Sequence, residues 1–116
     1  MKTKPKDLGT RFETFLVNYW RNHKLGAWRL AEEGINDQGD ILLSGIEQWT
    51  IEAKARANLN VSQTLAKAKE KSGSPWTAVV WKKLTRKGDN QRRSADGEPV
   101  VVIMSLDTFT RLIGGE

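Results

Sequence analysis

Residues 39–54 read Gly-Asp-Ile-Leu-Leu-Ser-Gly-Ile-Glu-Gln-Trp-Thr-Ile-Glu-Ala-Lys, and this stretch decides the fold. Residues 40–44 and 48–54 each have the length and apolar content of a short strand. The three residues 45–47 between them begin with glycine and are long enough for a tight loop. The stretch therefore predicts a β-hairpin.

The predicted hairpin brings charged side chains to one face of a sheet. If its loop is centred on Ile46, Asp40 lies opposite Glu52 with β-carbons about 4.5–5.5 Å apart. Lys54 lies on the same face, about 7 Å further along the strand. Paired carboxylates with room for water and phosphate oxygens are the ligands that Mg²⁺ or Mn²⁺ prefers. The alternative to a metal site is that Glu52 and Lys54 are ordinary charged residues on a solvated strand face.

The rest of the chain supplies helices and further strands around this hairpin. The predicted elements are a helix over 8–24, a strand over 27–31, a helix over 60–72, strands over 76–81 and 100–104, and a closing helix that Ser105 caps. In the closing helix Leu106, Phe109, Leu112 and Ile113 are expected to face the core. Residues 85–98 are polar and lack a hydrophobic period, which predicts a mobile basic loop. The pattern predicts one α/β domain over residues 1–116, with a mixed sheet flanked by helices.

Composition narrows the classes of function. The 116 residues include no cysteine, which excludes disulfides, thiolate metal sites and cysteine nucleophiles, and His23 is the only histidine. No glycine-rich phosphate loop is present, so no nucleotide cofactor is expected. The longest apolar run, Val100–Met104, is far shorter than the roughly 18 residues of a membrane span, so we expect a cytoplasmic protein without a membrane partner. The net charge of +5 favours a polyanionic partner.

Three short segments carry a resemblance to a known family. Gly39-Asp40-Ile41, Glu52-Ala53-Lys54 and the earlier Gly9-Thr10-Arg11-Phe12-Glu13 resemble the motifs of the PD-(D/E)XK nuclease superfamily. Within it, the chain is most similar to archaeal-type Holliday-junction resolvases and their small phage-encoded relatives, over residues 8–83. The resemblance implies a restriction-endonuclease-like sheet, with an αβββαβ core followed by a strand and a helix. Gly39 stands where the superfamily's name implies proline, and Asp37 is a rival carboxylate.

The resemblance also implies roles for single residues. Asp40 and Glu52 would be metal ligands, the Ala53 carbonyl a backbone ligand and Lys54 the group that assists the attacking water. Glu13 matches an additional acidic residue that reaches the metal site, and its alternative is an exposed helix carboxylate paired with Lys or Arg. Gln63 falls loosely where some relatives carry a polar residue on the second helix.

Basic residues cluster near these motifs and are candidates for contacts with nucleic acid phosphates. The candidates are Arg11, Arg56, Lys82, Lys83, Arg86, Lys87, Arg92 and Arg93. A solubilising basic surface is the alternative explanation.

Together these features predict a Mg²⁺- or Mn²⁺-dependent, structure-specific DNA endonuclease that hydrolyses phosphodiester bonds in branched DNA during recombination or repair. An exonuclease or nickase of the same superfamily acting on single-stranded or flap DNA, or a DNA-binding module without catalysis, would share most of these residues. Because a four-way junction needs two cuts and the chain has one site, the resemblance implies a homodimer. A phage-encoded protein acting in its host's cytoplasm would fit the same resemblance.

Overall fold

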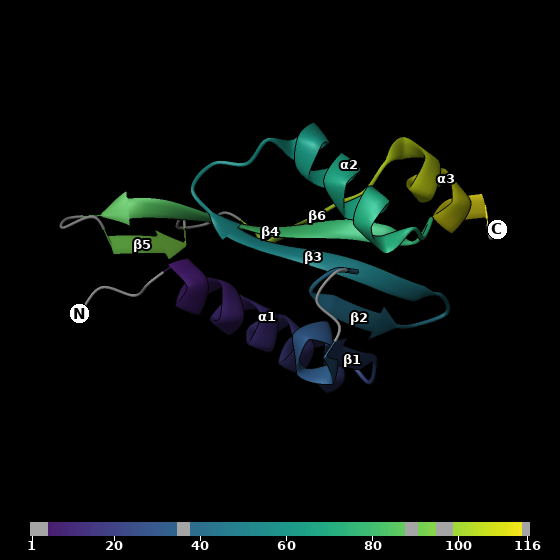
Figure 1. Ribbon diagram of the computed structural model, residues 1–116, viewed down its shortest axis with the longest axis horizontal. Helices are drawn as coiled ribbons and strands as arrows, with labels where there is room; N and C mark the ends of the chain where they lie inside the picture. Colours follow the sequence, from purple (N-terminus) through teal and green to yellow (C-terminus); the bar gives the residue numbers. More distant parts are fainter. Residues whose placement is uncertain (1–4, 35–37, 88–90, 95–98, 115–116) are drawn as a thin grey trace.

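The computed structural model describes residues 5–34, 38–87, 91–94 and 99–114 (Figure 1). Its elements are α1 (Pro5–Asn22), β1 (Gly26–Arg29), the short 3₁₀ turn η1 (Leu30–Glu33), β2 (Ile41–Ser44), β3 (Gln48–Arg56), α2 (Val61–Ser72), β4 (Thr77–Lys87), β5 (Gln91–Ser94), β6 (Val101–Ile103) and α3 (Leu106–Gly114). The predicted order of helices and strands is confirmed, with β5 as an addition. The fold is α/β.

The six strands form one mixed sheet in the order β1-β2-β3-β4-β5, with β6 also paired to β4. The β1, β2 and β3 strands are antiparallel neighbours, and β3 and β4 run parallel because α2 connects them. Figure 1 shows α1 on one side of the sheet and α2 with α3 on the other. The sheet is therefore covered by helices on both faces, as predicted.

The core lies between α1 and the sheet. Its buried side chains are Phe12, Leu16 and Val17 of α1 with Ala27, Ile41, Ile51, Ala53, Ala78 and Val80 of the strands. Successive residues of a strand point to opposite faces. Because Ile51 and Ala53 face α1, Glu52 and Lys54 of β3 face α2.

Most predicted strand boundaries shift by one or more residues, and the ends of β1 and β4 have clear structural consequences. The strand expected over 27–31 ends at Arg29, because Leu30 begins a 3₁₀ turn that closes at Gly34. The Leu30 N–H donates to the Asp40 carbonyl at 2.9 Å, which ties this turn to the start of β2. The strand expected over 76–81 continues to Lys87.

The prediction of a loop over residues 85–98 is wrong where the structure describes that segment. β4 extends to Lys87 and pairs antiparallel with β5, with Leu84 opposite Ser94 and Arg86 opposite Arg92. A two-stranded ribbon forms by backbone hydrogen bonds and does not need apolar side chains. The absence of a hydrophobic period therefore did not exclude strands here. Residues 88–90 and 95–98 of the expected loop lie outside the described residues.

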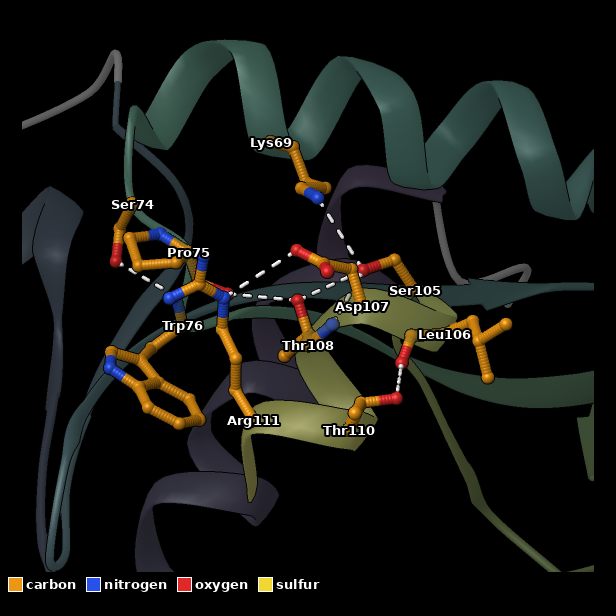
Figure 2. Close-up of polar contacts among 10 residues, drawn as sticks. All are labelled: Lys69, Ser74, Pro75, Trp76, Ser105, Leu106, Asp107, Thr108, Thr110 and Arg111. Atoms are coloured by element: carbon orange, nitrogen blue, oxygen red, sulfur yellow. Dashed lines mark hydrogen bonds and ion pairs between the residues drawn. The ribbon is translucent and has the colours of Figure 1, made fainter. Parts of the chain in front are cut away.

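The orientation predicted for the closing helix is also wrong. The four apolar side chains expected to face the core are instead exposed: Leu106, Phe109, Leu112 and Ile113. The helix docks through a polar contact, since the buried Thr108 Oγ1 donates to the Pro75 carbonyl at 2.9 Å (Figure 2). Ser105 caps the helix as predicted, and its Oγ accepts the Thr108 N–H at 3.0 Å. In the described part of the chain, no helix has the length and apolar character to cross a membrane.

Candidate active site

Asp40 is held at the point where the regular hairpin ladder ends. The predicted register of β2 and β3 is confirmed, and the ladder stops at Ile41, one residue after Asp40. Rather than continuing that ladder, the Asp40 N–H donates to the Ile51 carbonyl at 3.0 Å. Its Oδ2 accepts the Ala53 N–H at 2.8 Å. The carboxylate thus takes the position of a strand carbonyl and is fixed against β3.

Gly39 is required by the backbone that delivers Asp40. Its φ of +149° lies in a region that residues with a side chain rarely adopt. A Cβ at this position would lie 2.6 Å from Thr50 Cγ2 and 3.9 Å from Glu52 Oε2. Proline, which the superfamily's name implies here, is held near φ −65° and cannot take this conformation. A proline at position 39 would therefore need a different local backbone.

Glu52 is a buried carboxylate between two ammonium groups. Only 8% of the residue is exposed. Its Oε1 lies 3.5 Å from Lys54 Nζ of the same strand and 3.4 Å from Lys71 Nζ of α2. Because an unpaired buried charge is strongly unfavourable, the contacts with these two cations stabilise the folded position of Glu52.

Sequence patterns did not single out Lys71. The signal that could have found it is helical spacing: Asn60, Gln63, Lys67 and Lys71 recur at intervals of three or four residues, beside the buried Ala68. This places a polar row on the side of α2 that faces β3. The sequence alone shows the row, and the packing of α2 on β3 shows that the row meets Glu52.

The environment raises the pKa of Asp40 to about 6. Burial is the largest cause, and repulsion from Glu52 is the next. The Ala53 N–H and the Lys54 ammonium oppose this rise, and Glu13 adds to it. The predicted pairing of Asp40 directly opposite Glu52 is not part of the β2–β3 ladder, but the hydrogen bond from the Ala53 N–H places the Asp40 carboxylate beside the residue between Glu52 and Lys54.

Glu13 reaches the same region from α1 and is engaged by an arginine. Its Oε1 accepts from Arg29 Nε at 3.1 Å, and Arg29 Nη1 lies 2.9 Å from Glu32 Oε1. Glu13 is thus paired with an arginine, as the alternative expects, but its side chain is only 17% exposed, and it also contributes to the raised pKa of Asp40. In the described ranges, no three His, Asp or Glu side chains form a metal-binding group. The rival Asp37 lies outside the described residues.

A cleft of about 320 Å³ opens between β3 and α2, with Glu52 in its wall. It is lined by Glu52, Lys54, Arg56, Asn58, Leu59, Asn60, Gln63, Thr64, Lys67, Ala68 and Lys71. The candidates Arg56 and Gln63 are therefore brought to the cleft that contains Glu52. Glu52 and Lys54 of the hairpin share this cleft with them, whereas Asp40 is not among the residues that line it.

The other basic candidates are more dispersed. Arg56 lies opposite Lys83, and Ala55 opposite Lys82, in the parallel ladder of β3 and β4. Because neighbours on a strand alternate, Lys83 shares the face of Glu52, and Lys82 lies on the face that α1 covers. Arg11 is exposed on α1. The backbones of Arg86, Lys87, Arg92 and Arg93 belong to the β4–β5 ribbon, and their side chains lie outside the described part of the structure.

Comparisons with models of protein families, with curated proteins and with solved structures gave no match for this chain. The fold is thus established by the structure as α/β with a helix-flanked mixed sheet. The function is argued below from the site.

Proposed function

We propose that the protein is a Mg²⁺- or Mn²⁺-dependent DNA endonuclease with a restriction-endonuclease-like fold, acting on branched DNA in recombination or repair. The observation that carries this proposal is the arrangement around β3. There Asp40 is hydrogen-bonded to the Ala53 backbone, next to a buried Glu52 that two lysines contact. Maintaining a repelling, partly desolvated carboxylate pair is unfavourable for folding, which is typical of a functional site.

The donor set fits a hard divalent cation. Mg²⁺ is commonly held by one or two carboxylates, with waters and substrate phosphates completing its shell. Asp40 and Glu52 supply two such carboxylates, and the pKa of Asp40 is raised in part because Glu52 repels it. A bound cation would relieve that repulsion, lower the pKa of a coordinated water and neutralise charge on a phosphate. In this proposal Asp40 and Glu52 hold the ion, with the Ala53 carbonyl as a further donor.

The chain's own cations complete the chemistry. Lys54 Nζ lies beside Glu52, where it can hydrogen-bond an attacking water or a phosphate oxygen. Lys71 approaches from α2 and can neutralise charge that develops on the phosphate. Arg56 and Lys67 extend the positive wall of the cleft, which favours a strand of phosphates over a single anion.

We also propose that the protein acts as a homodimer, because two opposed cuts in a junction need two sites. Four exposed apolar side chains on α3 support this proposal: Leu106, Phe109, Leu112 and Ile113. An exposed apolar helix face of this kind is typical of an interaction surface.

The deciding experiment compares labelled four-way junctions, flaps and linear duplexes incubated with Mg²⁺, Mn²⁺ or EDTA. We expect metal-dependent cuts in the junction, which Asp40→Asn and Glu52→Gln abolish while binding persists. Cleavage of ends or flaps alone would indicate the exonuclease or nickase. Binding without cleavage under any ion would indicate a DNA-binding module, and variants that cut at the parental rate would contradict the site.

A further inference from the structure

The cleft between β3 and α2 has the charge of an anion-binding site. Four of the side chains that line it are cationic, Lys54, Arg56, Lys67 and Lys71, and one is anionic, Glu52. Glu52 lies in contact with Lys54 and Lys71. Arg56 and Lys67 thus add positive charge to a wall whose carboxylate is already neutralised.

The same cleft carries groups that phosphates alone do not need. Asn58 and Gln63 are exposed side-chain amides in its lining, and each offers both a donor and an acceptor. A phosphate offers acceptors only, whereas every base edge offers donors or acceptors in a fixed pattern. Asn60 has another task, since its Oδ1 accepts the Gln63 N–H and caps α2. The lining therefore suits a ligand that combines phosphates with bases.

A second hollow lies on the same face of the sheet, beside the end of the first cleft at Lys54 and Arg56. It encloses about 220 Å³ and is lined by Trp81, Lys83, Pro99 and Val101. The β3–β4 register places Trp81 opposite Lys54, and Lys83 opposite Arg56. The Trp81 Nε1–H donates to the Arg56 carbonyl at 3.0 Å, which holds the indole beside the first cleft. A positive groove followed by an aromatic ring is the combination that binds single strands by stacking.

The size of the cleft separates an unpaired strand from a duplex. A volume of about 320 Å³ is that of a small-ligand pocket. A duplex keeps its base edges inside grooves about 6 and 12 Å wide, so it would reach only the rim and leave the amides unused. We infer that the cleft between β3 and α2, continued by the hollow at Trp81, binds an unpaired DNA strand. This inference rests on the proposed function for the chemistry at Glu52, and it names the part of a branched substrate that enters the site.

The test measures fluorescence anisotropy at fixed salt in EDTA with two labelled probes, a single strand of about 15 nucleotides and the same strand in a duplex. We expect the single strand to bind about tenfold more tightly. Gln63→Ala removes an amide without changing charge, and Lys67→Gln removes a cation. Each should weaken single-strand binding about fivefold and change duplex binding less than about twofold. The matched control is Lys24→Gln, an exposed lysine just beyond α1 that does not line the cleft, which should leave both affinities unchanged.

Equal affinity for the two probes, or equal weakening of both by Gln63→Ala and Lys67→Gln, would overturn the inference. Trp81→Leu provides a separate check, since it should reduce the preference for the single strand without altering the net charge. The same protein preparations are then assayed for cleavage of a four-way junction with Mn²⁺. Selective single-strand binding without cleavage would support the inference and contradict the proposed function. Junction cleavage without selective single-strand binding would support the proposed function and contradict the inference.

Discussion

Lys71 of α2 and Glu52 of β3 form an ion pair of 3.4 Å although they lie 19 positions apart in the chain. Lys54 contacts the same carboxylate from a neighbouring position on its own strand. Glu52 is therefore paired with one lysine from its own strand and with a second lysine that the packing of α2 on the sheet brings to it. This double contact makes Lys71 the residue whose role is most directly testable.

Replacing Lys71 should affect catalysis more than stability. In Lys71→Gln we expect the cleavage rate with Mn²⁺ to fall about tenfold, because one cation near the phosphate is lost. The free energy of unfolding should change by less than about 1 kcal/mol, because Lys71 is partly exposed to solvent and Lys54 still pairs with the buried Glu52. Single-turnover cleavage and urea unfolding measure the two effects. Lys71→Arg should restore most of the rate, and an unchanged rate in Lys71→Gln would show that Lys71 does not act at the site.

Removing the charge of Asp40 should stabilise the protein in the absence of metal. The pKa of Asp40 is raised to about 6 in the folded state, above its ordinary value near 3.9. Folding therefore favours the protonated carboxyl, so the contribution of Asp40 to the stability of the parent chain falls as pH rises from about 4 to 6. At pH 7.5 in EDTA, Asp40→Asn should be more stable by about 1–2 kcal/mol. At pH 4 this gain should disappear.

Urea unfolding at both pH values tests this expectation, and the same variant is tested for cleavage with Mn²⁺. We expect a protein that is more stable and inactive. An Asp40→Asn variant that is less stable at pH 7.5 would show that the hydrogen bond from Ala53 outweighs the burial and repulsion of the charge.

Gly39 and Gly9 form a matched pair of glycines. At Gly39 the φ of +149° and a Cβ 2.6 Å from Thr50 Cγ2 make any side chain unfavourable, so Gly39→Ala should cost about 1–3 kcal/mol. It should also lower cleavage, because Asp40 follows directly. At Gly9, within α1, a Cβ meets nothing within 4 Å, so Gly9→Ala should stabilise by about 0.5–1 kcal/mol. Thermal unfolding of both variants checks the contrast, and similar effects at the two positions would contradict it.

The exposed face of α3 should determine the oligomeric state. Leu106 is 81% exposed and Ile113 is 70% exposed, while α3 is anchored through the buried Thr108. The double variant Leu106→Glu/Ile113→Glu should therefore keep the fold and sediment as a monomer, where the parent sediments as a dimer. Analytical ultracentrifugation with circular dichroism measures both properties. Val61→Glu, at an exposed apolar residue on α2, is the control and should remain dimeric. A monomeric parent, or a double variant that stays dimeric, would contradict the prediction.

Local patterns were sufficient for the hairpin and for most elements. The register of β2 with β3 follows from a three-residue loop and the alternation of side chains along each strand. The cap at Ser105 locates the start of α3, because its side-chain oxygen accepts a free helical N–H. Asn60, the first residue of the helix predicted over 60–72, is the cap of α2 in the structure. The same patterns could not place the faces of α3. An apolar stripe shows that one face of a helix differs from the other, but it does not show which face packs on the sheet. In α3 the buried face is the one from which Thr108 donates to the Pro75 carbonyl.

The sequence by itself determined the order of helices and strands, because each element has its own hydrophobic period along the chain. It also determined the hairpin and the closeness of Asp40, Glu52 and Lys54, because these depend on spacing along two neighbouring strands. Only the tertiary structure decided that Lys71 reaches Glu52, that Arg29 engages Glu13 and that a cleft opens under α2. These contacts join residues of different elements, and their geometry depends on how whole helices pack on the sheet. Periodicity along the chain carries no information on that packing beyond which faces are apolar.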